Sequence, residues 1–178
     1  MGRYIALLRG INVGGRNTLP MAGLRDICAE LGWTEVRTYI QSGNIVFDAA
    51  ARPLTLEDAL EQAIASRFRF SPAAIIRSAA QLNGIAKANP FRAASEKEPH
   101  WVLVGLAKRK LEAGAGEAIE ARGKADEKVA EAGGALWFHY PAGVGTSKLT
   151  PALIDRAAGS PVTARNWRTI TKLIEMLE

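Results

Sequence analysis

The sequence predicts an α+β protein built from two ferredoxin-like β-α-β-β-α-β subdomains, with a connecting helix and a C-terminal helix. Short apolar runs alternate with segments of helical periodicity, and the same order occurs twice along the chain. A glycine-bearing turn separates the two middle strands of each half, Ser42-Gly43 in the first and Gly133-Gly134 in the second. The 178 residues, of which 48% are hydrophobic, are enough to build two such cores.

In the first half, Pro20 suits the first turn of a helix whose apolar face carries Leu24, Ile27 and Leu31. Gly32 is expected to end this helix. A second helix is expected from about residue 55, because Thr55 and Asp58 resemble a capping box. The strands are expected at residues 3–9, 35–41, 44–48 and 73–77.

The second half repeats the order after a helix at about 79–88 and a linker. Helices are expected at 111–122, despite two glycines, at 149–158, and at 167–177 as the closing element. The strands are expected at residues 101–106, 128–132, 135–140 and 161–164. The predicted boundaries are therefore a first subdomain at 1–78, a connector at 79–99 and a second subdomain at 100–178. The topology repeats, but the residues themselves show no visible repeat.

Composition limits the class of protein. A formal net charge of +5 and a pI near 9.6 favour anionic partners without requiring them. The single cysteine, Cys28, excludes an internal disulfide and is typical of a reducing compartment. No signal-peptide pattern is present, and no apolar run reaches the roughly 18 residues of a membrane helix. We therefore expect a cytoplasmic protein without a membrane partner, with Cys28 buried and unreactive on its apolar helix face.

Three polar segments contain more Arg, Asn and Gln than a turn requires. They are LLRGINVGGRN (7–17), YIQSGNIVF (39–47) and TARNW (163–167). The first two strands of such a unit run in the same direction, so the loop at 10–17 should lie beside the hairpin residues Gln41, Ser42 and Asn44. In the second half, the segment 142–148 and the pair Arg165-Asn166 should share the opposite end of the sheet. Side chains of these types indicate a site for a polar, anionic ligand.

Each polar segment also has a plain structural interpretation. In a functional interpretation, backbone N–H groups at Gly10, Gly14 and Gly15 bind a phosphate. In the structural interpretation, these glycines only shape a tight loop. Their spacing matches neither GxGxxG nor Walker A. The segment GVGTSKLT, with Ser147 and Lys148, is an anion site at a helix start or a solvated cap. In the functional interpretation, the Arg165 guanidinium binds an anion. In the structural interpretation, Arg165 forms a buried ion pair between the halves, and Asn166 caps the last helix. Ser42-Gly43-Asn44 is also good hairpin chemistry.

No pattern identifies a reaction. His100 and His139 lie in or beside different strands, without a Cys or carboxylate at metal-ligand spacing, so no metal is expected. No Ser/His/Asp arrangement is indicated, because both histidines lie outside the polar segments. We expect no cofactor, and whether the protein is an enzyme is left open.

The polar motifs together resemble an uncharacterised bacterial family. The segments LLRGINVGG, TYIQSGNIVF, NPF, GVGTSK and TARNW occur in the order typical of the family called domain of unknown function 1697. The resemblance runs from Arg3 to the C-terminus and implies a two-part α+β fold, but no activity. It also implies that particular positions matter, namely Arg9, Asn12, Gln41, Ser42, Asn44, Lys148, Arg165 and Asn166. Arg16 stands where the family has Lys as often, which preserves the charge.

These patterns predict a cleft between the halves that binds a small anionic or nucleotide-like ligand. Arg9, Arg16, Lys148 and Arg165 would supply positive charge. Directional hydrogen bonds would come from the other predicted residues, Asn12, Gln41, Ser42, Asn44 and Asn166. Two alternatives remain. One is a nucleic-acid-binding module that uses the basic surface, although the expected glycine-aromatic RNA-binding pattern is absent. The other is a structural or interaction protein without a ligand.

Overall fold

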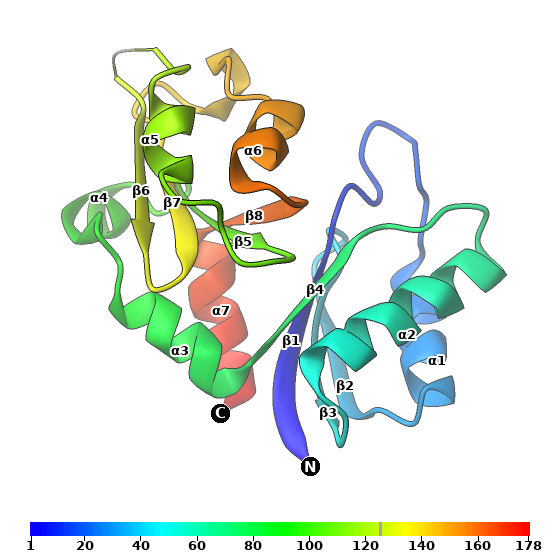
Figure 1. Ribbon diagram of the computed structural model, residues 1–178. Coiled ribbons are helices and arrows are strands. Elements are labelled where there is room, and N and C mark those ends of the chain that lie inside the picture. The colour runs from blue at the N-terminus through cyan, green and yellow to red at the C-terminus, as the bar shows by residue number, and fades with distance from the viewer. Residues whose placement is uncertain (125) are drawn as a thin grey trace. The chain divides into compact units, whose positions relative to one another are not determined.

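The computed structural model describes residues 1–124 and 126–178 (Figure 1). Contacts between residues divide the chain into two compact units, which we call unit 1 and unit 2. Unit 1 comprises Met1–Leu82 with Leu173–Glu178, and unit 2 comprises Asn83–Lys172. Each unit contains a four-stranded sheet and helices, which confirms the predicted α+β class. The predicted division into a first subdomain at 1–78, a connector at 79–99 and a second subdomain at 100–178 remains a prediction.

Unit 1 is a four-stranded antiparallel sheet in the order β2-β3-β1-β4, with α1 and α2 on one face (Figure 1). Apolar side chains of β1, β3 and β4 form the core with the inner faces of both helices, including Leu24, Ile27, Leu60 and Ile64. The elements are β1 (Gly2–Leu8), α1 (Met21–Glu30), β2 (Thr34–Tyr39), β3 (Asn44–Ala49), α2 (Pro53–Arg67) and β4 (Ala74–Ser78).

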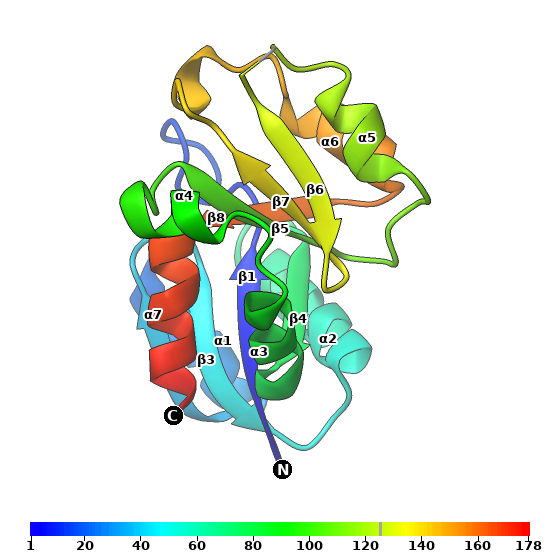
Figure 2. The same cartoon turned by 90° about the vertical axis from the view of Figure 1, so that its left-hand side faces the viewer.

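Unit 2 has the matching order β6-β7-β5-β8, and α5 and α6 contact each other beside it (Figure 2). Its core contains Ile119, Leu136 and Phe138. The chain enters this unit through α3 (Ala79–Lys87) and leaves it through α7 (Trp167–Leu177). Between them lie α4 (Arg92–Lys97), β5 (Val102–Ala107), α5 (Ala115–Glu120), β6 (Lys128–Ala132), β7 (Ala135–His139), a 3-10 turn (Val144–Thr146), α6 (Pro151–Ala158) and β8 (Val162–Asn166).

The strand register shows a repeat of residues that the sequence alone did not show. Ile5 of β1 pairs with Val46 and Arg77, and the equivalent Val104 of β5 pairs with Trp137 and Arg165. Arg77 and Arg165 are thus equivalent. In each, an Nη1 atom donates to the carbonyl of the preceding residue, at 2.8 and 3.0 Å respectively.

Helix carboxylates accept hydrogen bonds from backbone N–H groups of the edge strands β4 and β8. In unit 1, Glu57 of α2 accepts from Ile76 at 2.8 Å and Glu61 accepts from Ala74 at 2.7 Å. In unit 2, Asp155 of α6 accepts from Val162, which is equivalent to Ala74, at 3.0 Å. Glu57 and Asp155 both occupy the fifth position of a helix that begins with proline. Satisfying outward N–H groups in this way protects an edge strand from pairing with other chains.

Several local predictions are wrong. α2 begins at Pro53, and its N-cap makes no side-chain hydrogen bond, so the expected capping box is absent. α5 begins only after Gly114, whose left-handed φ of 75° is incompatible with a continuous helix from residue 111. The linker expected at 89–99 contains α4. Arg165 and Asn166 lie within β8 instead of after it.

The loops differ most between the units. β1 and α1 are joined by residues 9–20, whereas β5 and α5 are joined only by 108–114. The hairpin turn of unit 1 spans 40–43, compared with Gly133-Gly134 in unit 2. At the other end of the sheets the relation is reversed, because β3–α2 needs only 50–52 and β7–α6 uses 140–150. Each unit therefore has longer loops at one end, and these ends are opposite in the repeat.

Candidate functional site

The loop after β1 is a small hairpin, which we call the finger (residues 12–17). Val13 and Arg16 form an isolated antiparallel bridge, and the N–H of Asn12 donates to the carbonyl of Asn17 at 3.1 Å. The turn residues Gly14 and Gly15 have φ values of 57° and 72°, which glycine adopts without strain. The finger projects beyond the end of β1 (Figure 1). Its glycines are therefore accounted for by the turn, as in the structural interpretation.

Asn12 joins the base of the finger to the β2–β3 hairpin. Its Nδ2 donates to the carbonyls of Leu19 at 3.0 Å and Gln41 at 2.7 Å, and its Oδ1 accepts from the N–H of Leu19 at 2.8 Å. The loop and the hairpin are thus adjacent, as the topology predicts. Because the amide makes three contacts to backbone groups, Asn12 has a clear structural role.

The other predicted residues of unit 1 differ in accessibility. Asn44 is fully buried, and its Nδ2 donates to the Tyr39 carbonyl at 3.0 Å and to Ser42 Oγ at 2.9 Å, so it braces the turn. Gln41 and Arg16 are exposed, and Arg9 and Ser42 are half-buried. Ile40, in the same turn, has a φ of 50° and is 50% exposed, which is a strained position for a β-branched residue.

In unit 2 the predicted residues Arg165 and Asn166 pair with the first half of β5. Val102 pairs with His139 at the end of β7, and Leu103 pairs with Asn166 at the end of β8, so the two segments share one end of the sheet as predicted. Asn166 Oδ1 accepts from the N–H of Thr169 at 2.9 Å and caps the start of α7. Arg165 is half-buried, and burial lowers the pKa of its guanidinium to about 10. Lys148 is exposed.

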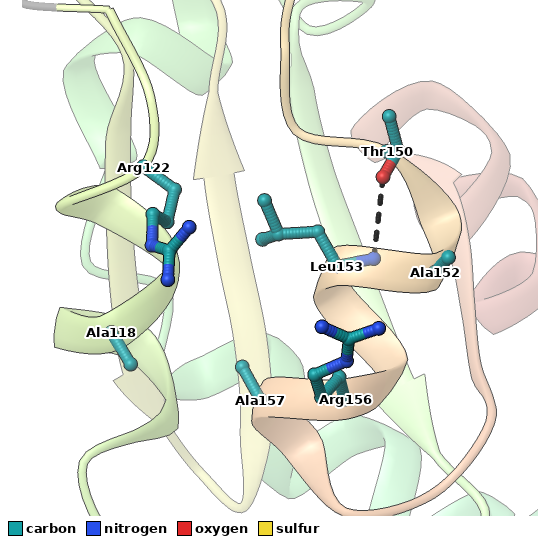
Figure 3. A pocket seen from close by; sticks show the side chains of 7 residues that line it. All are labelled: Ala118, Arg122, Thr150, Ala152, Leu153, Arg156 and Ala157. Carbon is teal, nitrogen blue, oxygen red and sulfur yellow. Dashed lines mark hydrogen bonds between the residues drawn. The ribbon is translucent and has the colours of Figure 1, made fainter.

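A groove between α5 and α6 offers a different site, which sequence reasoning missed. It encloses about 340 Å³ and is lined by Ala118, Arg122, Thr150, Ala152, Leu153, Arg156 and Ala157. Figure 3 shows the two arginine side chains on opposite sides, with the Leu153 side chain between them. Thr150 is the N-cap of α6, and its Oγ1 accepts from the N–H of Leu153 at 3.2 Å. We call this the α5–α6 groove.

The two arginines of this groove have no anionic partner in the structure. Within residues 1–124 and 126–178, neither guanidinium makes an ion pair or a side-chain hydrogen bond. A weak signal for this exists in the sequence. Helical arginines are often paired with an acid one turn away, but the preceding turns offer Ala118 and Ile119 to Arg122, and Ala152 and Leu153 to Arg156.

Charge is distributed unevenly between the units. Unit 2 has 14 lysines and arginines against nine acidic residues, whereas unit 1 has nine of each. The whole net charge of +5 therefore belongs to unit 2. A second hollow on unit 2, of about 530 Å³, is lined by Glu117, Glu120 and Glu127 together with two lysines, so it is a poorer site for an anion.

Other classes of site find little support. Among the residues that the structure describes, no three His, Cys, Asp or Glu side chains gather as metal ligands would. None of the helices described is long and apolar enough to cross a bilayer. Cys28 is fully buried, and burial raises the pKa of its thiol to about 12, which confirms its predicted burial.

Comparison with known proteins identifies the family. The family described as "Protein of unknown function (DUF1697)" matches residues 1–137, and the chain belongs to it. A solved structure of a conserved bacterial protein from Streptococcus pneumoniae is similar, with a TM-score of 0.74 and 24% identity over 99% of each chain. At this identity the likeness shows the fold alone. No curated protein matches the chain.

Proposed function

We propose that unit 2 binds a small anionic ligand in the α5–α6 groove, between Arg122 and Arg156. The observation that carries the proposal is the pair of guanidinium groups on opposite sides of one groove, without a carboxylate partner among the described residues. A guanidinium offers a planar set of donors that suits carboxylate and phosphate oxygens.

The surroundings of the groove favour an anion. The excess positive charge of unit 2 raises the local concentration of negative ligands. Ala118, Leu153 and Ala157 line the space next to the arginines. Both arginines are exposed, so an anion can reach them, and the apolar side chains beside them limit the access of water to an anion once it is bound.

The residues predicted from sequence have other assignments in this proposal. Asn12, Asn44 and Asn166 brace the backbone through their amides. Arg9, Arg16, Gln41, Ser42, Lys148 and Arg165 stay predicted ligand residues, and the predicted cleft between the halves stays a prediction.

A thermal-shift screen tests the proposal first, with sulfate, phosphate, carboxylates and nucleotides as ligands. A ligand that binds only the folded state raises the melting temperature in a concentration-dependent way. The affinity of each hit is then measured by calorimetry for the wild type and for Arg156→Gln. Loss of one charged hydrogen-bonding partner should weaken binding about tenfold.

Arg168→Gln is the matched control, because Arg168 is an exposed arginine of unit 2 outside the groove. It changes the net charge equally and should leave the affinity within about twofold, since distant exposed charges are screened by salt. Equal losses in both variants would show that charge alone attracts the ligand and would contradict a site in the groove. Binding of polynucleotides with a steep salt dependence, unaffected by Arg156→Gln, would favour a nucleic-acid-binding module instead.

A further inference from the structure

The positive charge of the α5–α6 groove is provided at two separate places. Arg122 follows the C-terminal end of α5, and Arg156 lies in the last turn of α6. Figure 3 shows the two side chains on different helices, with the aliphatic side chain of Leu153 between them. A ligand with one compact anionic group contacts one of these guanidinium groups well, whereas a ligand with two anionic ends can pair with both.

The region between the arginines is aliphatic. Ala118, Ala157 and Leu153 present only methyl and methylene groups, and the oxygen of Thr150 already accepts a hydrogen bond from the backbone. The described lining residues include no aromatic side chain on which a nucleobase could stack. The middle of a matching ligand is therefore a short hydrocarbon chain, without a base or a row of hydroxyl groups.

We infer that the ligand class of this groove is a short aliphatic dicarboxylate, with one carboxylate on Arg122 and the other on Arg156. This inference rests on the proposed function and makes it more specific. Each carboxylate accepts a pair of parallel hydrogen bonds from one guanidinium. The methylene chain lies against Ala118, Leu153 and Ala157 and loses contact with water.

A helix-dipole role is the competing explanation for the two arginines. Cations near the C-terminal ends of helices interact favourably with the backbone carbonyls, whatever their shape. That role is served by lysine as well as by arginine, and its loss changes stability without changing any affinity. Bidentate binding of a carboxylate requires the planar guanidinium, so arginine-to-lysine substitutions separate the two explanations.

The experiment measures by calorimetry the affinities of malonate, succinate, glutarate and adipate, with butyrate, inorganic phosphate and AMP as comparison ligands. We expect one chain length to bind best, and to bind at least about tenfold more tightly than butyrate, since butyrate has one carboxylate fewer. In Arg122→Lys and in Arg156→Lys, the best dicarboxylate should bind no more tightly than butyrate does. Arg168→Lys should change nothing.

Two kinds of failure are distinguishable. If phosphate or AMP binds more tightly than every dicarboxylate, and the groove variants weaken it, the anion site stands and the dicarboxylate class is wrong. Equal affinities for butyrate and for all four diacids would also overturn the class. If none of these anions binds, or if the groove variants weaken none of them, the proposed function itself is wrong.

Discussion

Units 1 and 2 have the same framework but are elaborated at different places. Both place their strands in one order, with arginine at an equivalent position of the edge strand and a carboxylate that seals this edge. Unit 1 adds the finger and a four-residue turn, whereas unit 2 builds the same parts with a shorter loop and Gly133-Gly134. Because unit 2 folds without them, the framework does not require the finger or the longer turn.

The two units also differ in net charge and in the kind of surface feature that each carries. Unit 1 has no net charge, and its finger and β2–β3 turn are held by side-chain amides. Unit 2 carries the whole net charge of +5 and contains the groove between two short helices. The polar segments that stand out in the sequence are mainly loops and turns with left-handed residues, whose backbone groups are hydrogen-bonded by asparagine amides. The groove residues stand out only when α5 and α6 are placed together. Conspicuous polar residues therefore identified the braced loops more readily than the candidate binding groove.

The largest expected effect comes from a carboxylate that seals β4. Glu57→Ala should lower the free energy of unfolding by about 3 kcal/mol, because it removes the buried carboxylate that pairs with Arg77 and leaves the buried N–H of Ile76 without its acceptor. Asp155→Ala, at the same helix position in unit 2 but half-buried, should cost about 1–2 kcal/mol. Urea unfolding measures both. A larger loss for Asp155 than for Glu57 would contradict the comparison.

Asn12 is the next test, because it braces the finger that unit 2 lacks. Asn12→Ala removes three hydrogen bonds and places alanine at a φ of 53°, and should cost about 2 kcal/mol in chemical unfolding. Asn12→Gly relieves the backbone strain and serves as the control that isolates the hydrogen bonds. A loss below about 0.5 kcal/mol in both variants would mean that the finger is not rigidly held by this amide.

Ile40 provides a smaller effect of opposite sign. Its left-handed backbone is unfavourable for a β-branched side chain, and half of its surface is exposed, so little burial is lost on substitution. Ile40→Asn should raise the free energy of unfolding by up to about 1 kcal/mol, since asparagine tolerates this conformation. Destabilisation would show that the Ile40 side chain makes contacts that outweigh the backbone strain.

The last expected effect is confined to alkaline pH, where the Cys28 thiol ionises in the unfolded state before it does in the folded state. Burial raises the pKa of this thiol to about 12 in the folded protein, from 9.0 for an ordinary thiol. The folded state therefore favours the protonated thiol, so this stabilisation is complete below pH 9 and is lost as the pH rises from 9 toward 12. Wild type should lose more stability over this range than Cys28→Ala, as measured by urea unfolding. Identical pH profiles would contradict the assigned environment.

Much of the fold follows from sequence patterns, because periodicity and turn glycines act locally. The closing helix at 167–177 and the strand at 128–132 have the predicted boundaries. α4 was missed because Pro90 and the mixed polar residues around it are typical of a linker. The groove could not be predicted, since Arg122 and Arg156 are brought together only by the packing of α5 against α6. The one sequence signal, the lack of an acid three or four positions before each arginine, is shared by other exposed arginines such as Arg168.

NMR of the arginine Nε–Hε groups can show directly whether an anion binds to unit 2, in its α5–α6 groove, or to unit 1. The signals of Arg122, Arg156, Arg9 and Arg16 are assigned from single arginine-to-lysine variants and followed during a titration with glutarate. We expect saturable shifts of the Arg122 and Arg156 signals at a common Kd, while those of Arg9 and Arg16 stay in place. Saturable shifts of Arg9 and Arg16, with Arg122 and Arg156 unchanged, would place the ligand on unit 1 and contradict the proposed site.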